Sequence, residues 1–387
     1  MRARIAYFLI LVVTACGVKE KTDVVSDEKI KQHAQELADK FIIVDGHIDL
    51  PDLLKEKKYK AGIDSPDTLI STGKGEFDYT RAKQGGLDAP FMSIYIPVEY
   101  QAKKDNGKEL ADSLINTVVA ITNALPDKFA LANTPADIEA NTQAGKISLP
   151  MGMENGAPIG KDLANVKYFF DRGIRYITLA HNADNQICDS SRDSVHTNHG
   201  LSTFGKEVVA EMNKVGIIVD ISHVDDETFY QVMEISKAPA IASHSSCRKF
   251  SPKATRDMTD DMIKKLGEKD GLIMINFFTA FLDSTAMKTM GEFDSTHPNP
   301  TNIETVANHI DNVVKIAGID HVGFGSDFDG VSGSLPVGLD DVSKYPDLIY
   351  TLLKRGYSDE DIEKICYKNA FRVWNKVIDV SKSLQGQ

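Results

Sequence analysis

The sequence contains little cysteine and no pair of the form C-x-x-C: four cysteines occur among 387 residues. This scarcity argues against a zinc finger and against a dense disulfide framework, because both need clustered or numerous cysteines. Beyond Cys16 near the N-terminus, the chain has Cys188, Cys247 and Cys366. One disulfide among these three would be compatible with the sequence, which does not select its ends.

Positive charge is also scarce relative to negative charge. The 44 Lys and Arg residues stand against 56 Asp and Glu residues, and the formal net charge is −12. An acidic chain of this kind argues against nucleic acid as a partner. The remaining composition, 42% hydrophobic and 26% charged, is that of a globular protein long enough for one large domain or two small ones.

The apolar run near the N-terminus, residues 5–13, is too short to cross a bilayer as a mature helix. It follows a basic start and precedes "VTAC", so residues 1–15 are predicted to be a secretory signal peptide. "VTAC" resembles a bacterial lipoprotein box, and we favour lipidation of Cys16 over an ordinary cleaved signal. Residues 16–29 are polar without an apolar period and predict a flexible tether. These features together predict a lipid-anchored protein of the cell envelope, facing the periplasm or the cell surface.

Eight short apolar runs, rich in branched residues and ending in polar groups, recur along residues 30–387. They begin at Phe41, Phe91, Ile147, Ile174, Gly216, Ala238, Gly271 and His321. Continuous apolar runs suit parallel strands that are buried on both faces. The segments between them have apolar residues at steps of three and four, which predicts helices.

This alternation predicts a single (β/α)8 TIM-like barrel of the metal-dependent hydrolase type over residues 30–387. The rival, a doubly wound open sheet, would place a glycine-rich phosphate turn after the first strand, whereas the sequence there is "VDGHIDLP". Residues 99–145 exceed one helix and predict two helical pieces. The chain is predicted to be helical from residue 338 to its end, with "SDED" as a helix start.

Titratable side chains follow most of the predicted strands, where the chain would reach the mouth of the barrel. They are His47, Asp49, Glu154, His181, His223, His244 and Asp327. His47 and Asp49 are two residues apart, so on a strand both side chains leave from the same face and can reach one cation. A lone histidine is more often structural than a ligand, but this set together predicts a site.

Imidazoles with carboxylates, and without thiolates, suit Zn²⁺ or another borderline divalent ion. With His47, Asp49, His223 and His244 as terminal ligands and Glu154 between them, the set suffices for two ions. Two ions can share a water, generate hydroxide at neutral pH and polarise a carbonyl, so hydrolysis of an amide or ester is the expected chemistry.

The other histidines are assigned no chemistry. Surface positions are predicted for His33, His297 and His309, a loop at the barrel mouth for His196 and His199, and the far end of the barrel for His321.

Several motifs resemble the membrane dipeptidase family, also called renal dipeptidases, whose members are two-zinc (β/α)8 enzymes that cleave dipeptides. The motifs are "VDGHIDLP", "GMENG", "ITLAHN", "SHSSCR" and "HVGFGSDFDGV", and the similarity extends over about residues 41–377. The resemblance implies two Zn²⁺ per subunit. One would be held by His47 and Asp49 and the other by His223 and His244, with Glu154 as the bridge.

The same resemblance implies roles for three further residues. His181 would contact the scissile carbonyl and stabilise the oxyanion, and Arg256 would bind the free carboxylate of the substrate. Asp327 would take a proton from the bridging water and pass it to the leaving amine. Asp329 is assigned to loop structure.

Two departures from the family pattern bear on substrate range rather than on reaction type. This chain has Arg256-Asp257 where family members often have arginine and asparagine, and Phe281 where some have a tyrosine.

The sequence therefore predicts a zinc-dependent dipeptidase that acts through a metal-bridging hydroxide. Members of the resembled family are commonly homodimers, while the sequence itself leaves the oligomeric state open. One alternative is another binuclear amidohydrolase acting on acyl amino acids, lactones or β-lactams. Its activity would not require a free amino group on the substrate. The other is a lipoprotein that binds zinc or a ligand without turnover, against which the proton-transfer residue Asp327 counts.

Overall fold

The computed structural model describes residues 19–56, 69–71, 73–289, 297–331 and 333–386. The predicted signal peptide and the lipidation site Cys16 lie outside these residues and stay predictions. Among the described helices, none combines the length and the apolar character that a membrane crossing requires.

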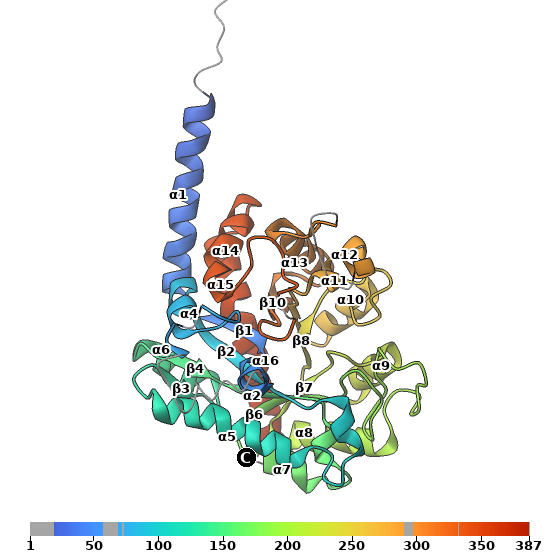
Figure 1. The fold of residues 1–387 in the computed structure, drawn as a ribbon. Coiled ribbons are helices and arrows are strands. Elements are labelled where there is room, and N and C mark those ends of the chain that lie inside the picture. Colours follow the sequence, from blue (N-terminus) through green and yellow to red (C-terminus); the bar gives the residue numbers. More distant parts are fainter. Residues whose placement is uncertain (1–18, 57–68, 72, 290–296, 332, 387) are drawn as a thin grey trace, which may run out of the picture.

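Eight parallel strands close into a barrel in the order β1-β10-β9-β8-β7-β6-β5-β2 (Figure 1). Their bounds are β1 Ile43–Ile48, β2 Leu87–Tyr95, β5 Met151–Glu154, β6 Ile174–Thr178, β7 Ile218–Asp220, β8 Ile241–Ser245, β9 Leu272–Ile275 and β10 Val322–Phe324. Each of the eight predicted runs supplies one barrel strand, so the predicted (β/α)8 fold is confirmed. The strands are almost entirely buried, because the outer face packs on helices and the inner face fills the barrel.

The third predicted run is divided by Pro150 into two strands. β4 (Ile147–Leu149) leaves the barrel and pairs with β3 (Phe129–Leu131) in a separate two-stranded sheet, and only β5 joins the barrel. Two helices flank β3, α5 (Lys108–Ala124) and α6 (Pro135–Gln143), which confirms the two helical pieces predicted within residues 99–145. Strand β3 itself was not predicted.

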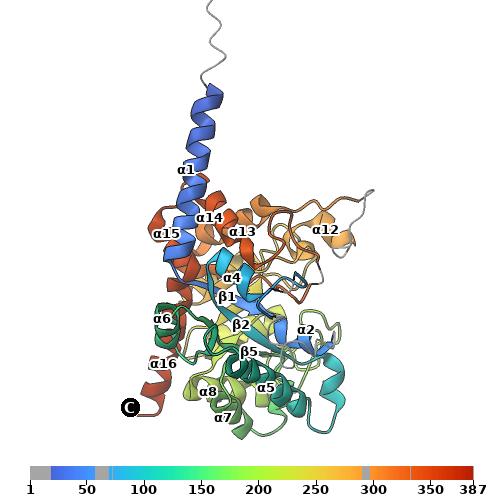
Figure 2. The same ribbon diagram turned by 60° about the vertical axis from the view of Figure 1, so that its left-hand side comes forward.

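The remaining helices surround the barrel (Figures 1 and 2). Their bounds are α2 Leu50–Glu56, α4 Tyr79–Gly85, α7 Ala164–Asp171, α8 Thr203–Val215, α9 Asp226–Ile235, α10 Asp260–Glu268, α11 Thr279–Leu282, α12 Ser284–Thr289, α13 Ile303–Ala317, α14 Tyr345–Lys354, α15 Asp359–Glu363 and α16 Asn369–Leu384. Ser358 caps α15 in a capping box with Asp361, which confirms the helix start predicted at "SDED".

The final helix, α16, closes the end of the barrel opposite the functional side chains. Phe371, Trp374 and Val377 of this helix form one buried cluster with residues that fill the barrel interior. The ring of Phe91 on β2 lies 5.3 Å from the Trp374 ring and 5.3 Å from the Tyr176 ring, measured between centroids. The barrel is therefore filled at one end by aromatic packing and is free to carry polar groups at the other.

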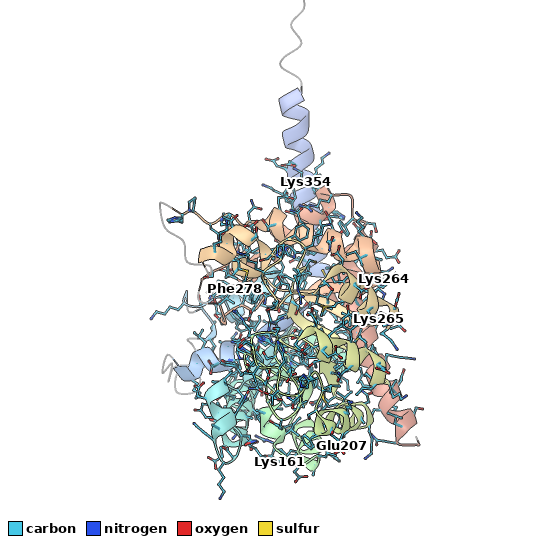
Figure 3. All side chains as sticks on the ribbon, turned by 90° about the vertical axis from the view of Figure 1, so that its right-hand side faces the viewer. Lys161, Glu207, Lys264, Lys265, Phe278 and Lys354 are labelled. Carbon is cyan, nitrogen blue, oxygen red and sulfur yellow. The ribbon has the colours of Figure 1, made fainter. Side chains whose placement is uncertain are left out.

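Helix α1, Lys19–Lys40, corrects the prediction of a flexible tether, because the chain is helical from Lys19 onward. The helix projects from the body of the molecule (Figures 1 and 2), and its C-terminal part lies against α14. Lys354 of α14, labelled at the base of α1 in Figure 3, pairs with Asp27 at 3.0 Å between Nζ and Oδ1. The absence of an apolar period was misleading because a polar helix can be held by packing near one end.

The predicted surface position of His309 is wrong, since this residue of α13 is fully buried. Its Nδ1 accepts a hydrogen bond from the Cys247 backbone N–H at 3.0 Å, and its Nε2–H donates to the Leu282 carbonyl at 3.0 Å. Burial lowers the pKa of His309 to about 4, so the ring is neutral at pH 7. Because both ring nitrogens find backbone partners, the ring can lie in the core. Cys188, Cys247 and Cys366 are buried free thiols.

Candidate metal centre and active site

The mouth of the barrel gathers the titratable side chains predicted from the strand ends. His47 and Glu154 lie at the ends of β1 and β5, His244 lies within β8, and His181, His223 and Asp327 follow β6, β7 and β10. A cavity of about 880 Å³ is lined by Asp49, Glu154, His181, His223, His244 and Asp327. His47 is fully buried beneath it.

Glu154 lies at the centre of this group, and its two oxygens face different partners. Oε2 is 3.5 Å from His47 Nε2, whereas Oε1 is 2.9 Å from His223 Nε2 and 3.3 Å from His244 Nε2. Asp49 Oδ2 lies 3.3 Å from His47 Nε2. The side chains therefore form two adjoining sets that share one carboxylate.

Hydrogen bonds on the far side of two rings determine which nitrogen faces the centre. Tyr176 donates its hydroxyl proton to the Gly46 carbonyl at 3.0 Å, so the 2.9 Å contact with His47 Nδ1 has the imidazole N–H as donor. Ser243 likewise donates to Asp220 Oδ2 at 2.7 Å and accepts from His244 Nδ1 at 2.8 Å. In the neutral rings, the Nε2 lone pairs of His47 and His244 therefore point into the cluster.

This arrangement fits divalent cations. The Nε2 atoms of His223 and His244 lie 3.0 Å apart, both beside Glu154 Oε1. His47 Nε2 and Asp49 Oδ1 are buried without a hydrogen-bond partner. The lone pairs of His47 and His244 and the oxygens of Asp49 and Glu154, held this close and shielded from water, repel one another unless a cation lies among them. Three groups of residues each offer ligand atoms that lie within 4.8 Å of one another inside the group. They are His47–Asp49–Glu154, Glu154–His181–His223 and His47–His244–Asp327.

The electrostatics of the cluster also favour bound positive charge. Burial alone would lower the pKa of His47, but Tyr176, Asp49 and Glu154 outweigh burial and raise this pKa well above its usual value. The pKa values of His223 and His244 are well below the usual value, chiefly because of burial. The buried carboxylates of Asp49 and Glu154 thus favour a positive charge beside them. A bound cation can supply this charge in place of the proton on His47.

The backbone is strained at two of these residues. His223 and Asp327 both have φ of +68°, in the left-handed region that non-glycine residues rarely adopt. The Asp327 N–H donates to the His47 carbonyl at 3.1 Å, and Asn276 Nδ2 donates to Asp327 Oδ2 at 2.9 Å. Such strain costs about 1–3 kcal/mol per residue and persists where the surroundings fix it, which is common at functional sites.

His181 and Arg256 adjoin the cluster in different ways. His181 Nε2 lies 3.7 Å from Glu154 Oε1, and its ring meets the edge of the Tyr95 ring at 4.9 Å between centroids. Arg256 is buried and donates to the His244 carbonyl and to Ser245 Oγ, both at 2.5 Å. It lines a smaller adjoining cavity rather than the large one. The structure thus brings together all the predicted residues, while their individual roles stay predictions.

Sequence reasoning missed the buried groups that orient the cluster. Asp45 accepts from the backbone N–H groups of His47 and Ser326 and from the Tyr345 hydroxyl. Asp220 accepts from the backbone N–H groups of Ser222 and Ser243 in addition to the Ser243 hydroxyl. A signal was available, because each aspartate interrupts an apolar run shortly before a predicted histidine ligand. Nothing in the sequence pointed to Tyr176.

Asp189, His196 and Asp225 form a further group with metal-ligand spacing, and none of the three lines the large cavity. Asp189 already accepts from the backbone N–H groups of Asn198 and Gly200, and Asp225 accepts from that of Thr228 as the N-cap of α9. These carboxylates support the loops that carry them. Asp329, predicted to have a loop role, exchanges hydrogen bonds with Glu76: its Oδ1 accepts from the Glu76 N–H at 2.6 Å.

Replacing Tyr176 by phenylalanine is expected to weaken metal binding about 10- to 100-fold, because His47 loses the partner that orients its ring. Zinc affinity measured by competition with a chromogenic chelator tests this expectation. Tyr230→Phe is the matched control, because it removes a hydroxyl that binds Asp261 on the surface. Equal affinities of the two variants and the parent would show that Tyr176 does not orient a ligand.

Comparison with known proteins gives a consistent result. The family described as membrane dipeptidase (peptidase family M19) matches residues 31–387. An uncharacterized dipeptidase of Schizosaccharomyces pombe is 34% identical over 358 residues, which cover 89% of this chain and 83% of that protein.

Two solved structures share the fold. The probable dipeptidase PvdM from Pseudomonas aeruginosa superposes with a TM-score of 0.79 at 25% identity, covering 91% of this chain and 99% of that one. A metallo peptidase from Rhodobacter sphaeroides, liganded with a phosphinate mimic of the dipeptide L-Ala-D-Ala, has a TM-score of 0.75 at 26% identity. The match covers 87% of this chain and 99% of that one.

Proposed function

The chain belongs to the membrane dipeptidase family and is a metallo-dipeptidase, and from that premise we propose that it hydrolyses dipeptides with two zinc ions. The observation that carries the proposal is Glu154, which turns one oxygen to His47 and the other to His223 and His244. His47 and Asp49 would hold one ion, and His223 and His244 the other. When bound, two such ions would lower the pKa of a shared water, supply hydroxide at neutral pH and polarise the scissile carbonyl.

Asp327 is the residue that we propose to transfer the proton. Burial raises the pKa of its carboxyl to about 7, with further contributions from Asp49 and Glu154, and nearby cations would lower it again. Asn276 occupies Oδ2, which leaves Oδ1 for the proton. As the water oxygen adds to the carbonyl carbon, Asp327 takes the proton. It then donates this proton to the amine nitrogen as the C–N bond breaks.

His181 is proposed to stabilise the negative charge that develops on the carbonyl oxygen. Burial lowers the pKa of this imidazole, so the ring is neutral and carries one N–H. Tyr95 packs against the ring and restricts its orientation. A donor fixed in a buried cavity before the reaction contributes more than a donor in water, because it needs no reorganisation when the charge appears.

The site offers a positive charge for the carboxylate end of a dipeptide and negative charges for its ammonium end. Arg256 Nε is buried and donates no hydrogen bond, so Arg256 can receive the free carboxylate. The carboxylates of Asp52, Glu76 and Asp329 line the large cavity, and among the described residues that line it Arg192 is the only Lys or Arg. This charge distribution favours the ammonium end of the substrate in the cavity. A longer peptide would leave Arg256 unpaired, which limits the substrate to two residues.

Amino-acid release from a panel of L,L and L,D dipeptides, a tripeptide and N-acetylated dipeptides tests the proposed function. Protein lacking residues 1–16 is expected to cleave free dipeptides alone, to lose activity with a chelator and to regain it with zinc. Cleavage of the acetylated substrates would instead favour an acyl-substrate amidohydrolase. Zinc-loaded protein that left every substrate intact would favour a binding protein without turnover.

Asp327→Asn is expected to lower kcat by about 10²–10⁴-fold, because the variant cannot take up the proton. Its zinc content, measured by atomic emission, should stay near that of the parent. Asp379→Asn is the control for the loss of one carboxylate, since Asp379 is exposed on α16 at the opposite end of the barrel. Unchanged turnover of Asp327→Asn would refute the assignment of proton transfer to this residue.

A further inference from the structure

A second, smaller cavity of about 150 Å³ lies beside the large one and is called the side pocket here. Its lining comes from three places, namely the loop after β6, the loop after β8 and the helices that follow β9. Arg192 and Phe281 line both cavities, so the two cavities adjoin at these residues. A substrate lying over the cluster of histidines and carboxylates can therefore extend a group into the side pocket.

The charge of the side pocket is opposite to that of the chain as a whole. Arg192, Lys253 and Arg256 line it, and none of the lining residues that the structure describes is Asp or Glu. The whole chain has 56 acidic and 44 basic residues, and the adjoining large cavity is lined mainly by carboxylates among its charged groups. Three cations around a small cavity indicate an anionic ligand.

The cations of the side pocket are held in place by neighbouring groups. The guanidinium carbons of Arg192 and Arg256 lie 5.9 Å and 5.7 Å from the centroid of the Phe281 ring, within the range of a cation–π contact. The Thr255 hydroxyl donates to the Ser191 carbonyl at 2.8 Å and ties the two loops that carry Arg192 and Lys253. Phe281 thus contacts both guanidinium groups through its ring, which needs no hydroxyl group.

Arg256 has one nitrogen free to bind the substrate, so it cannot bind both the C-terminal carboxylate of a dipeptide and a second carboxylate. Its Nη1 and Nη2 already donate to Ser245 Oγ and to the His244 carbonyl, and Nε is the nitrogen without a partner. In the proposed function this arginine receives the carboxylate that every dipeptide has at its C-terminus. Arg192 and Lys253 then remain as cations of the side pocket without an assigned ligand.

We propose that the side pocket binds a carboxylate side chain on the C-terminal residue of the substrate, so that the enzyme prefers dipeptides ending in glutamate or aspartate. This inference rests on the proposed function and names its substrate class. A cavity of about 150 Å³ equals the liquid volume of about five waters, which suits a short acidic side chain. Arg192 provides the contact at the junction of the cavities, and Lys253 adds charge farther along the pocket wall.

The preference should be moderate and sensitive to salt. Arg192 and Lys253 are exposed, so solvent and ions screen their interaction with a bound carboxylate. We expect the effect chiefly in KM, because the side chain of the substrate lies away from the reacting atoms.

The test compares kcat/KM for Ala-Glu and Ala-Gln, which are nearly isosteric and differ in the charge of one side chain. The ratio of the two values is expected to exceed one in the zinc-loaded parent, to fall by up to about fivefold in Arg192→Gln and to fall less in Lys253→Gln, as the loss of one exposed ion pair predicts. Arg192→Lys should retain part of the preference. Lys264→Gln is the charge-matched control. Lys264 is exposed on α10, well away from Phe278, which lines the large cavity (Figure 3).

Two results would overturn the inference while leaving the proposed function intact. One is a parent enzyme that cleaves Ala-Gln as well as Ala-Glu. The other is an equal loss on both substrates in Arg192→Gln, which would assign Arg192 to the backbone carboxylate that all dipeptides share. Failure of the parent to cleave either substrate would instead contradict the proposed function itself.

Discussion

The carboxylate of Glu154 links the two halves of the site, and much of the barrel mouth is arranged around it. One oxygen faces His47 and the other faces His223 and His244, and Asp49 lies beside His47, so the three histidines and two carboxylates surround one place. These groups come from strands that are distant in sequence, and only closure of the parallel barrel brings the strand ends to one place. The fold therefore has a direct chemical consequence, which is a pair of ligand sets a few ångströms apart.

Holding polar groups this close in a buried place is costly, and the structure shows how the cost is offset. Buried hydroxyl and carboxylate groups fix the rings, as Tyr176 does for His47 and the pair Ser243 and Asp220 does for His244. The opposite end of the barrel is filled by aromatic and aliphatic side chains around Trp374, which supplies the apolar packing that the mouth lacks. Bound cations would relieve the remaining repulsion between lone pairs, which would couple metal binding to the stability of the mouth.

The sequence allowed the barrel and the residues of the site to be predicted. Buried parallel strands give continuous apolar runs, and the titratable residues at the ends of these runs are easily recognised. It failed where tertiary packing decides. His309 was predicted at the surface, yet it adjoins the buried face of α13, where backbone groups of Cys247 and Leu282 satisfy both ring nitrogens. The polar start of α1 lacks a periodic apolar face, yet the chain is helical there and the helix packs on α14. Tyr176 on β6 orients His47 on β1 because of how the barrel strands are aligned. The spacing of residues along one strand does not reveal that alignment.

The central claim is that Glu154 bridges two bound cations, and the number of metal ions per chain tests it most directly. Zinc would be counted by plasma mass spectrometry after reconstitution and removal of excess metal, in the parent and in Glu154→Gln. The account predicts two ions per parent chain and the loss of at least one in the variant, because the amide has only one oxygen and no negative charge. Two tightly held ions in Glu154→Gln, or a single ion in the fully reconstituted parent, would contradict it.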